Sequence, residues 1–154
     1  AESLGMSFVD MDQVIVEEAG HSISRIVESH GLPYFRGLEK SLLVRLAQGD
    51  GWVIATGGGV VLDPENRLLM RKMGRVIWLK ADIDVILQRL RQDAVSAEQR
   101  PAFSDRNLHD ETVTVLRERT PVYEGVCDAA VDTSTKNIGE CVDEIVQLIH
   151  KDKN

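Results

Sequence analysis

Four short apolar runs, separated by longer segments with helical periodicity, constrain the fold of this 154-residue chain most strongly. The runs occupy residues 6–9, 52–56, 75–79 and 129–131. Each is apolar or β-branched and is bounded by turn residues, which is typical of buried strands. Because strands alternate with helices along the chain, we predict an α/β fold of three layers, α/β/α, in which helices cover both faces of a parallel sheet.

Residues that favour helix starts stand between these runs. Ser22 can cap one helix, and Pro33 suits the first turn of the next. Asp63 and Asp82 precede two further helices. After a polar stretch, the pattern predicts a helix that ends near Arg119 and then a last helix from residue 137.

Length and composition limit the classes of protein to consider. A chain of 154 residues without a linker-like segment predicts one domain, residues 1–154. The net charge of −7 disfavours a general nucleic-acid or anionic-membrane binder, and no apolar run reaches the roughly 18 residues of a membrane span. Two cysteines are too few for a disulfide framework, which favours the cytoplasm.

Two predicted strands end in residues that could carry chemistry, and ligands of open parallel sheets bind at such ends. Asp10 and Asp12 follow the first strand. They could orient or deprotonate a hydroxyl, or they could simply cap a helix. Gly57, Gly58 and Gly59 follow the second strand. Without side chains they allow a ligand to approach the backbone, although a permissive loop would have the same composition.

Three arginines are further candidates, each with an ordinary alternative. Arg36 lies three residues before Glu39, where a surface ion pair is the alternative. Arg119 could offset a helix dipole. Arg100 lies in the polar stretch at residues 92–106, which could be a lid or a plain surface loop.

In their order along the chain, these features resemble the shikimate kinase family. The matching segments are FVDMD at 8–12, GHSI at 20–23, FRGLE at 35–39, IATGGG at 54–59, NR at 66–67, VIWL at 76–79, RP at 100–101, RTPVY at 119–123 and VDT at 131–133. They span essentially the whole chain. The resemblance implies a P-loop fold similar to the nucleoside-monophosphate kinases, with ATP-dependent phosphorylation of shikimate to 3-phosphoshikimate for aromatic amino-acid biosynthesis.

The resemblance also implies roles for individual residues within a substrate-binding region at about 10–59. Arg36 and Arg119 would bind the shikimate carboxylate, for which the planar guanidinium is well suited. Asp12 would hold the hydroxyls and act on the nucleophile. The backbone at Gly57, Gly58 and Gly59 would pack against the ring.

The nucleotide side of the site follows from the same resemblance. Arg100 would act from a lid at about 92–106 that closes over the ATP phosphates. Lys136 would lie against the base, and Asp10 would hold a water molecule bound to Mg²⁺. Magnesium is expected because charge spreads over the phosphate oxygens during transfer. The partners are therefore shikimate and ATP, without nucleic acid or membrane, and a monomer is expected.

One departure from the family pattern is the absence of any G-x-x-x-x-G-K-[ST] phosphate loop. The family carries this loop, and the strand before it, just ahead of the segment that opens this sequence. We therefore expect roughly two dozen further residues before Ala1, the length of a strand, its loop and a helix start. Two alternatives remain at this stage: another small-molecule kinase, such as a gluconate kinase, or a related binding or regulatory protein that does not transfer phosphate.

Overall fold

The computed structural model describes residues 1–92 and 105–151 of the chain. Its strands are β1 (Ser7–Asp10), β2 (Trp52–Ala55), β3 (Ile77–Lys80) and β4 (Ala129–Asp132). Its α-helices are α1 (Met11–Ala19), α2 (Ile23–His30), α3 (Leu32–Leu46), α4 (Pro64–Met73), α5 (Ile83–Gln92), α7 (Asp105–Val126) and α8 (Ile138–Lys151). Two short 3₁₀ helices are η1 (Glu2–Leu4) and η2 (Val60–Leu62). The predicted lid and Arg100 lie outside the described residues, apart from the ends of α5 and α7.

All four predicted strands are present, and they pair in parallel. In the first sheet, β1 and β2 align Asp10 with Ala55. In the second, β3 and β4 align Ile77 with Ala129. The α/β class with parallel strands is confirmed, but the ladders among the described residues form two two-stranded sheets instead of one.

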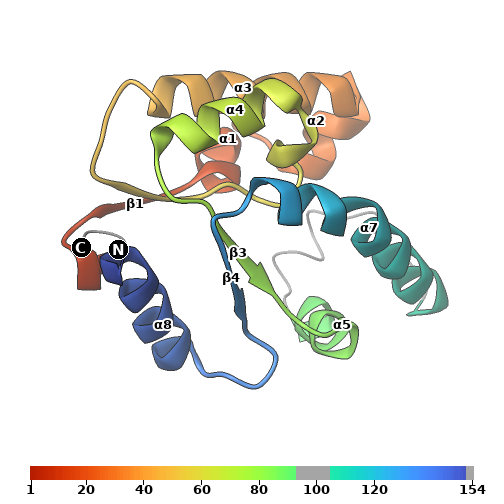
Figure 1. The fold of residues 1–154 in the computed structure, drawn as a ribbon. Coiled ribbons are helices and arrows are strands. Elements are labelled where there is room, and N and C mark those ends of the chain that lie inside the picture. The colour runs from red at the N-terminus through yellow and green to blue at the C-terminus, as the bar shows by residue number, and fades with distance from the viewer. Residues whose placement is uncertain (93–104, 152–154) are drawn as a thin grey trace. The chain divides into compact units, whose positions relative to one another are not determined.

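Residues 1–73 are the described part of the first of two compact units. Helix α3 is its centre, because α3 contacts α1, α2, α4 and η2. Figure 1 shows α3 and α4 lying beside each other in this unit. Its core is built from apolar side chains of these helices and of the η2 turn: Met11, Ile15, Ile26, Phe35, Leu42, Leu43, Val60, Val61 and Met70.

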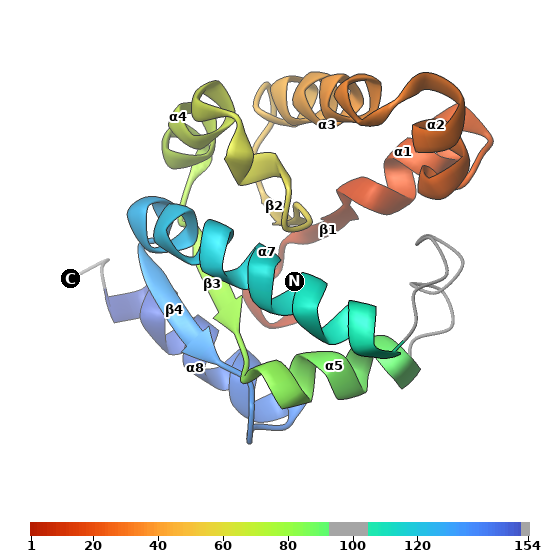
Figure 2. The same cartoon turned by 90° about the vertical axis from the view of Figure 1, so that its right-hand side faces the viewer.

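The described part of the second unit runs from residue 74 to 92 and from 105 to 151. Figure 2 shows β3 and β4 side by side, with α5 and α7 on one face and α8 on the other. Leu87, Val126 and Val131 are buried in this unit. The prediction of a single domain over residues 1–154 stays a prediction.

The helix starts follow the local rules that the sequence suggested. The Ser22 hydroxyl accepts a hydrogen bond from the Arg25 N–H at 3.4 Å. The Asp63 carboxylate accepts one from the Glu65 N–H at 2.8 Å, at the start of α4. Pro33 lies in the first turn of α3, where its missing N–H costs nothing.

The predicted end of a helix near Arg119 is wrong, because α7 continues through Pro121 to Val126. Proline removes one hydrogen bond within a helix and usually ends or kinks it. Here tertiary packing extends the helix past the proline. The Tyr123 ring lies 5.5 Å from the Trp78 ring of β3, and Val126 is 2% exposed.

No helix in the described ranges is both long enough and apolar enough to cross a membrane.

Candidate functional site

The carboxyl ends of β1 and β2 bring the first acidic segment against the glycine run. Because Asp10 lies opposite Ala55 in the ladder, the residues after each strand are neighbours. A β-carbon placed on Gly57 would lie 3.4 Å from Asp12 Oδ2. Gly57 has φ of +72°, a conformation that side-chain-bearing residues rarely adopt. Glycine at this position therefore serves the turn that faces Asp12.

The two carboxylates after β1 have different roles in the structure. Asp10 Oδ1 accepts hydrogen bonds from the backbone N–H groups of Asp12 at 2.9 Å and of Gln13 at 3.2 Å. Asp10 is thus the N-cap of α1, as the alternative interpretation of this segment proposed. The Asp12 carboxylate takes no part in this cap and instead lies against the glycine run.

Partial burial raises the pKa of Asp12 above its ordinary value. Desolvation is the main reason that its pKa is raised, and the negative charge of Asp10 acts in the same direction. The positive charge of Arg36 opposes both effects. A carboxylate with a raised pKa accepts a proton more readily, which suits a group that acts on a hydroxyl.

Arg36 forms an ion pair with Glu39, but the pair is not the exposed surface pair that was one interpretation of the sequence. Its Nη1 donates to Glu39 Oε2 at 2.5 Å, and the Glu39 side chain is only 3% exposed. Arg36 itself stays 30% exposed and lies over the Phe35 ring at 5.5 Å. A buried acid therefore holds one edge of the guanidinium, while part of the Arg36 side chain stays exposed.

Glu39 is a site residue whose role the sequence analysis missed. A signal was available, because Glu39 follows Phe35 by four residues and precedes Leu42 by three. That spacing places it on the same face of α3 as two core residues. A charged residue on an apolar helix face indicates a buried partner and not a surface pair.

A pocket of about 310 Å³ lies beside this cluster, near the lower limit for small-ligand sites. Arg36 and Gly59 form part of its wall. Its other lining residues come from the start of α3 and from the η2–α4 segment: Leu32, Pro33, Val60, Leu62, Asp63 and Asn66.

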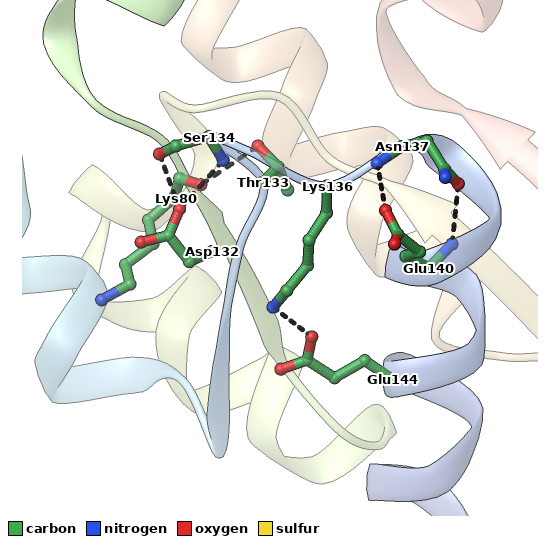
Figure 3. A network of polar contacts seen from close by, with 8 residues as sticks. All are labelled: Lys80, Asp132, Thr133, Ser134, Lys136, Asn137, Glu140 and Glu144. Atoms are coloured by element: carbon green, nitrogen blue, oxygen red, sulfur yellow. Dashed lines mark hydrogen bonds and ion pairs between the residues drawn. The ribbon is translucent and has the colours of Figure 1, made fainter.

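The second unit carries two further predicted residues. Arg119 is half-buried within α7. Lys136 forms an ion pair with Glu144 of α8, in the loop between β4 and α8 (Figure 3). At the end of β4, Asp132 Oδ1 accepts hydrogen bonds from both the N–H and the hydroxyl of Ser134. Polar contacts to β4 and α8 therefore hold the loop that bears Lys136.

Arg89 of α5 also reaches this loop, a contact that residue types and spacing do not predict. Its Nη1 donates to the Thr133 hydroxyl at 2.8 Å, and its Nη2 donates to the Thr133 carbonyl at 2.6 Å. This side chain ties α5 to the end of β4.

Within the first unit, the structure brings together Asp12, Arg36, Gly57 and Gly59. Gly58 is exposed between the two other glycines. An acceptor, a cation and exposed backbone in one place can bind a small molecule that carries both hydroxyl and carboxylate groups.

Comparison with known proteins identifies a family. The family model described as shikimate kinase matches residues 1–150. The chain belongs to the shikimate kinase family. A shikimate kinase of Caldanaerobacter subterraneus is 37% identical over 151 residues, which cover 98% of this chain and 85% of that relative. One from Rhodopirellula baltica is 35% identical over 147 residues, covering 96% and 79%.

A solved structure supports the same family. The shikimate kinase from Acinetobacter baumannii, in complex with shikimate, superposes with a TM-score of 0.90 at 30% identity. The match covers 99% of this chain and 83% of that protein. The resemblance, the fold class and the kinase function expected from the sequence are confirmed at the level of the family.

Proposed function

We propose that this protein transfers the γ-phosphoryl group of ATP to a hydroxyl of shikimate, and that Arg36 binds the shikimate carboxylate. The observation that carries the proposal is the Arg36–Glu39 pair beside the glycine run. Glu39 fixes one guanidinium nitrogen, so that the remaining N–H donors are oriented for a bidentate carboxylate contact. Arg119, matched to the family through RTPVY, supplies a second cation for the same carboxylate.

Asp12 acts on the reacting hydroxyl in this proposal. The hydroxyl oxygen attacks the γ-phosphorus, and the bond from that phosphorus to the β–γ bridging oxygen breaks. ADP then leaves with the bonding electron pair, and the hydroxyl proton passes to the Asp12 carboxylate. The raised pKa of Asp12 favours this transfer, because the carboxylate is then a stronger proton acceptor. Gly58, which is exposed between Gly57 and Gly59, lets the substrate ring pack closely against the backbone.

The residues present fit a magnesium ion that is held mainly by phosphates and water. In the described residues, no group of three acidic, histidine or cysteine side chains could hold a metal. Magnesium in kinases commonly has only one or two carboxylate ligands and keeps several water molecules. Asp10, whose Oδ1 caps α1, would hold one of these water molecules, as the family resemblance implies. When bound, the ion offsets the phosphate charge during transfer.

The second unit supplies nucleotide contacts in this proposal. Lys136 would lie against the base, a role that rests on the family resemblance, and in the structure its ammonium group pairs with Glu144. Arg100 would contact the phosphates from a lid at 92–106, a role that rests on the family resemblance alone. We place the reaction in the cytoplasm, which the small number of cysteines in the sequence favours, and we expect a monomer.

We expect the 154-residue chain by itself to bind ATP weakly or not at all. Its sequence contains no G-x-x-x-x-G-K-[ST] loop, and such loops make most phosphate contacts in kinases of this fold. Isothermal titration with ATP and Mg²⁺ measures this directly, and titration of the same preparation with shikimate controls for folding. Micromolar ATP affinity would contradict the prediction.

A coupled assay of ADP release tests the function as a whole. It is run on the protein expressed from its complete open reading frame, with shikimate, gluconate and no acceptor in parallel. We expect release that depends on shikimate alone. Release with gluconate would favour another small-molecule kinase, and shikimate binding without release would favour a binding or regulatory protein.

A further inference from the structure

Backbone conformation does not explain why residue 59, the third of the run after β2, is a glycine. Gly59 has φ of −98° and ψ of −22°, values that any residue adopts. Its carbonyl accepts a hydrogen bond from the Leu62 N–H at 3.0 Å, as in an ordinary turn. Glycine is therefore not needed here for the turn, in contrast to Gly57 with its positive φ.

Gly59 stands out because another group occupies the space that a side chain at this position would need. A β-carbon at this position would lie 1.9 Å from Arg36 Nη1, 2.3 Å from Cζ and 2.4 Å from Nη2. Carbon and nitrogen atoms in contact stay roughly 3.5 Å apart. The guanidinium of Arg36 thus lies directly on the α-carbon of a buried glycine.

The backbone at Gly59 is held from behind and cannot easily give way. The next residues, Val60 and Val61, are 1% and 4% exposed. Asn66 Nδ2 donates to the Val60 carbonyl at 3.0 Å, and Arg67 Nη1 donates to the Val61 carbonyl at 2.7 Å. Any added atom would therefore displace the end of the flexible arginine side chain, and not the turn.

We infer that Gly59 is a positioning residue: its missing side chain is the space that lets Arg36 lie, paired with Glu39, where it can bind the substrate carboxylate. This inference rests on the proposed function and deepens it. This role differs from a direct contact between the Gly59 backbone and the substrate ring. Here Gly59 affects substrate binding only through the position of Arg36. An alanine would move the guanidinium by about 1.5 Å, and misplacement by about 1 Å can reduce activity a hundredfold.

A double-mutant cycle between Gly59→Ala and Arg36→Ala tests the inference, with shikimate affinity measured by calorimetry and folding by thermal denaturation. We expect Gly59→Ala to weaken shikimate binding at least tenfold when Arg36 is present, and less than threefold in the Arg36→Ala background. Gly74→Ala is the matched control, because the added carbon meets no atom within 4 Å, and its affinity should equal that of the wild type.

The outcomes of this double-mutant cycle distinguish a positioning role of Gly59 from a direct backbone contact with the substrate. Equal losses in both backgrounds would overturn the positioning role and indicate a direct backbone contact with the ring. Unchanged binding in Gly59→Ala alone would also overturn it. If Gly59→Ala does not fold, the double variant must recover the fold, and failure to recover it would contradict the steric argument. A normal affinity in Arg36→Ala alone would instead refute the proposed carboxylate contact.

Shikimate methyl ester gives a second readout that a general structural defect would not produce. The ester lacks the negative charge that Arg36 is proposed to bind. Gly59→Ala should therefore reduce the preference for shikimate over its ester at least fivefold while leaving ester affinity nearly unchanged. Equal weakening of both ligands would count against the inference.

Discussion

Asp12→Asn is expected to lower kcat for shikimate phosphorylation by roughly 10²–10⁴-fold, the usual contribution of a positioned acid–base group. Asparagine keeps the shape of the side chain and can still contact hydroxyls, but it cannot take up a proton. The loss should therefore appear mainly in kcat, with a smaller change in KM for shikimate. The assay of ADP release, run on the wild type and Asp12→Asn at saturating ATP, measures kcat and the KM for shikimate.

The same variant should be more stable than the wild type at neutral pH. Because burial and Asp10 raise the pKa of Asp12, the folded state binds this proton more tightly than the unfolded state does. Above both pKa values, the ionised carboxylate therefore costs stability, and asparagine removes that cost. We expect a higher Tm at pH 7 and a gain that disappears as the pH falls below the unfolded pKa of about 4.

These two readouts together distinguish a functional carboxylate from a structural one. A structural role for Asp12 predicts a lower Tm, with the loss of activity following the loss of fold. In the wild type, kcat/KM should fall on the acid side at a pH above the ordinary aspartate value near 3.8, because ionised Asp12 is required. Full activity in Asp12→Asn would refute the proposed proton transfer.

Arg36→Ala is expected to weaken shikimate binding by about 1.5–3 kcal/mol, or roughly 10- to 150-fold, the value of a hydrogen bond to a charged group. The change also removes the ion-pair partner of Glu39, which is 3% exposed, so some stability will be lost. Calorimetric titration with shikimate gives the affinity, and thermal denaturation measured alongside it identifies the temperature range in which the variant is folded.

Arg45→Ala is a matched control on the same helix. Arg45 also pairs with an acid, Glu18, at 2.6 Å, but both side chains are more than half exposed. An exposed pair contributes little, so neither shikimate affinity nor stability should change measurably. Arg119→Ala should reproduce the affinity loss of Arg36→Ala. Unchanged affinity in both Arg36→Ala and Arg119→Ala would refute the carboxylate assignment.

Much of the local structure could be predicted from the sequence because it depends on neighbouring residues. The four strands appear within two residues of their predicted bounds, since alternating apolar runs and turn residues act over a few positions. Ser22 caps its helix as expected because capping needs only a side-chain oxygen near the first N–H groups. Family membership was also readable, since the order of short motifs spans most of the chain.

The helix end predicted near Arg119 was wrong for a tertiary reason. A proline within a helical pattern ends the helix if only local propensity counts. In the structure, the Tyr123–Trp78 contact and the burial of Val126 compensate for the missing hydrogen bond. Trp78 lies 43 positions before Pro121, so a reading of local propensity does not reveal this contact.

The sequence by itself determined the order of elements, the family and the set of candidate residues, because these follow from residue types and their spacing. Tertiary structure decided which groups surround each candidate residue. Asp10 caps a helix, whereas Asp12, two residues later, gains a raised pKa from burial beside the glycine run. Glu39 became the anchor of Arg36 only through burial in the core face of α3. Gly59 lies against the guanidinium of Arg36, a residue 23 positions earlier in the sequence. This contact depends on side-chain packing in three dimensions.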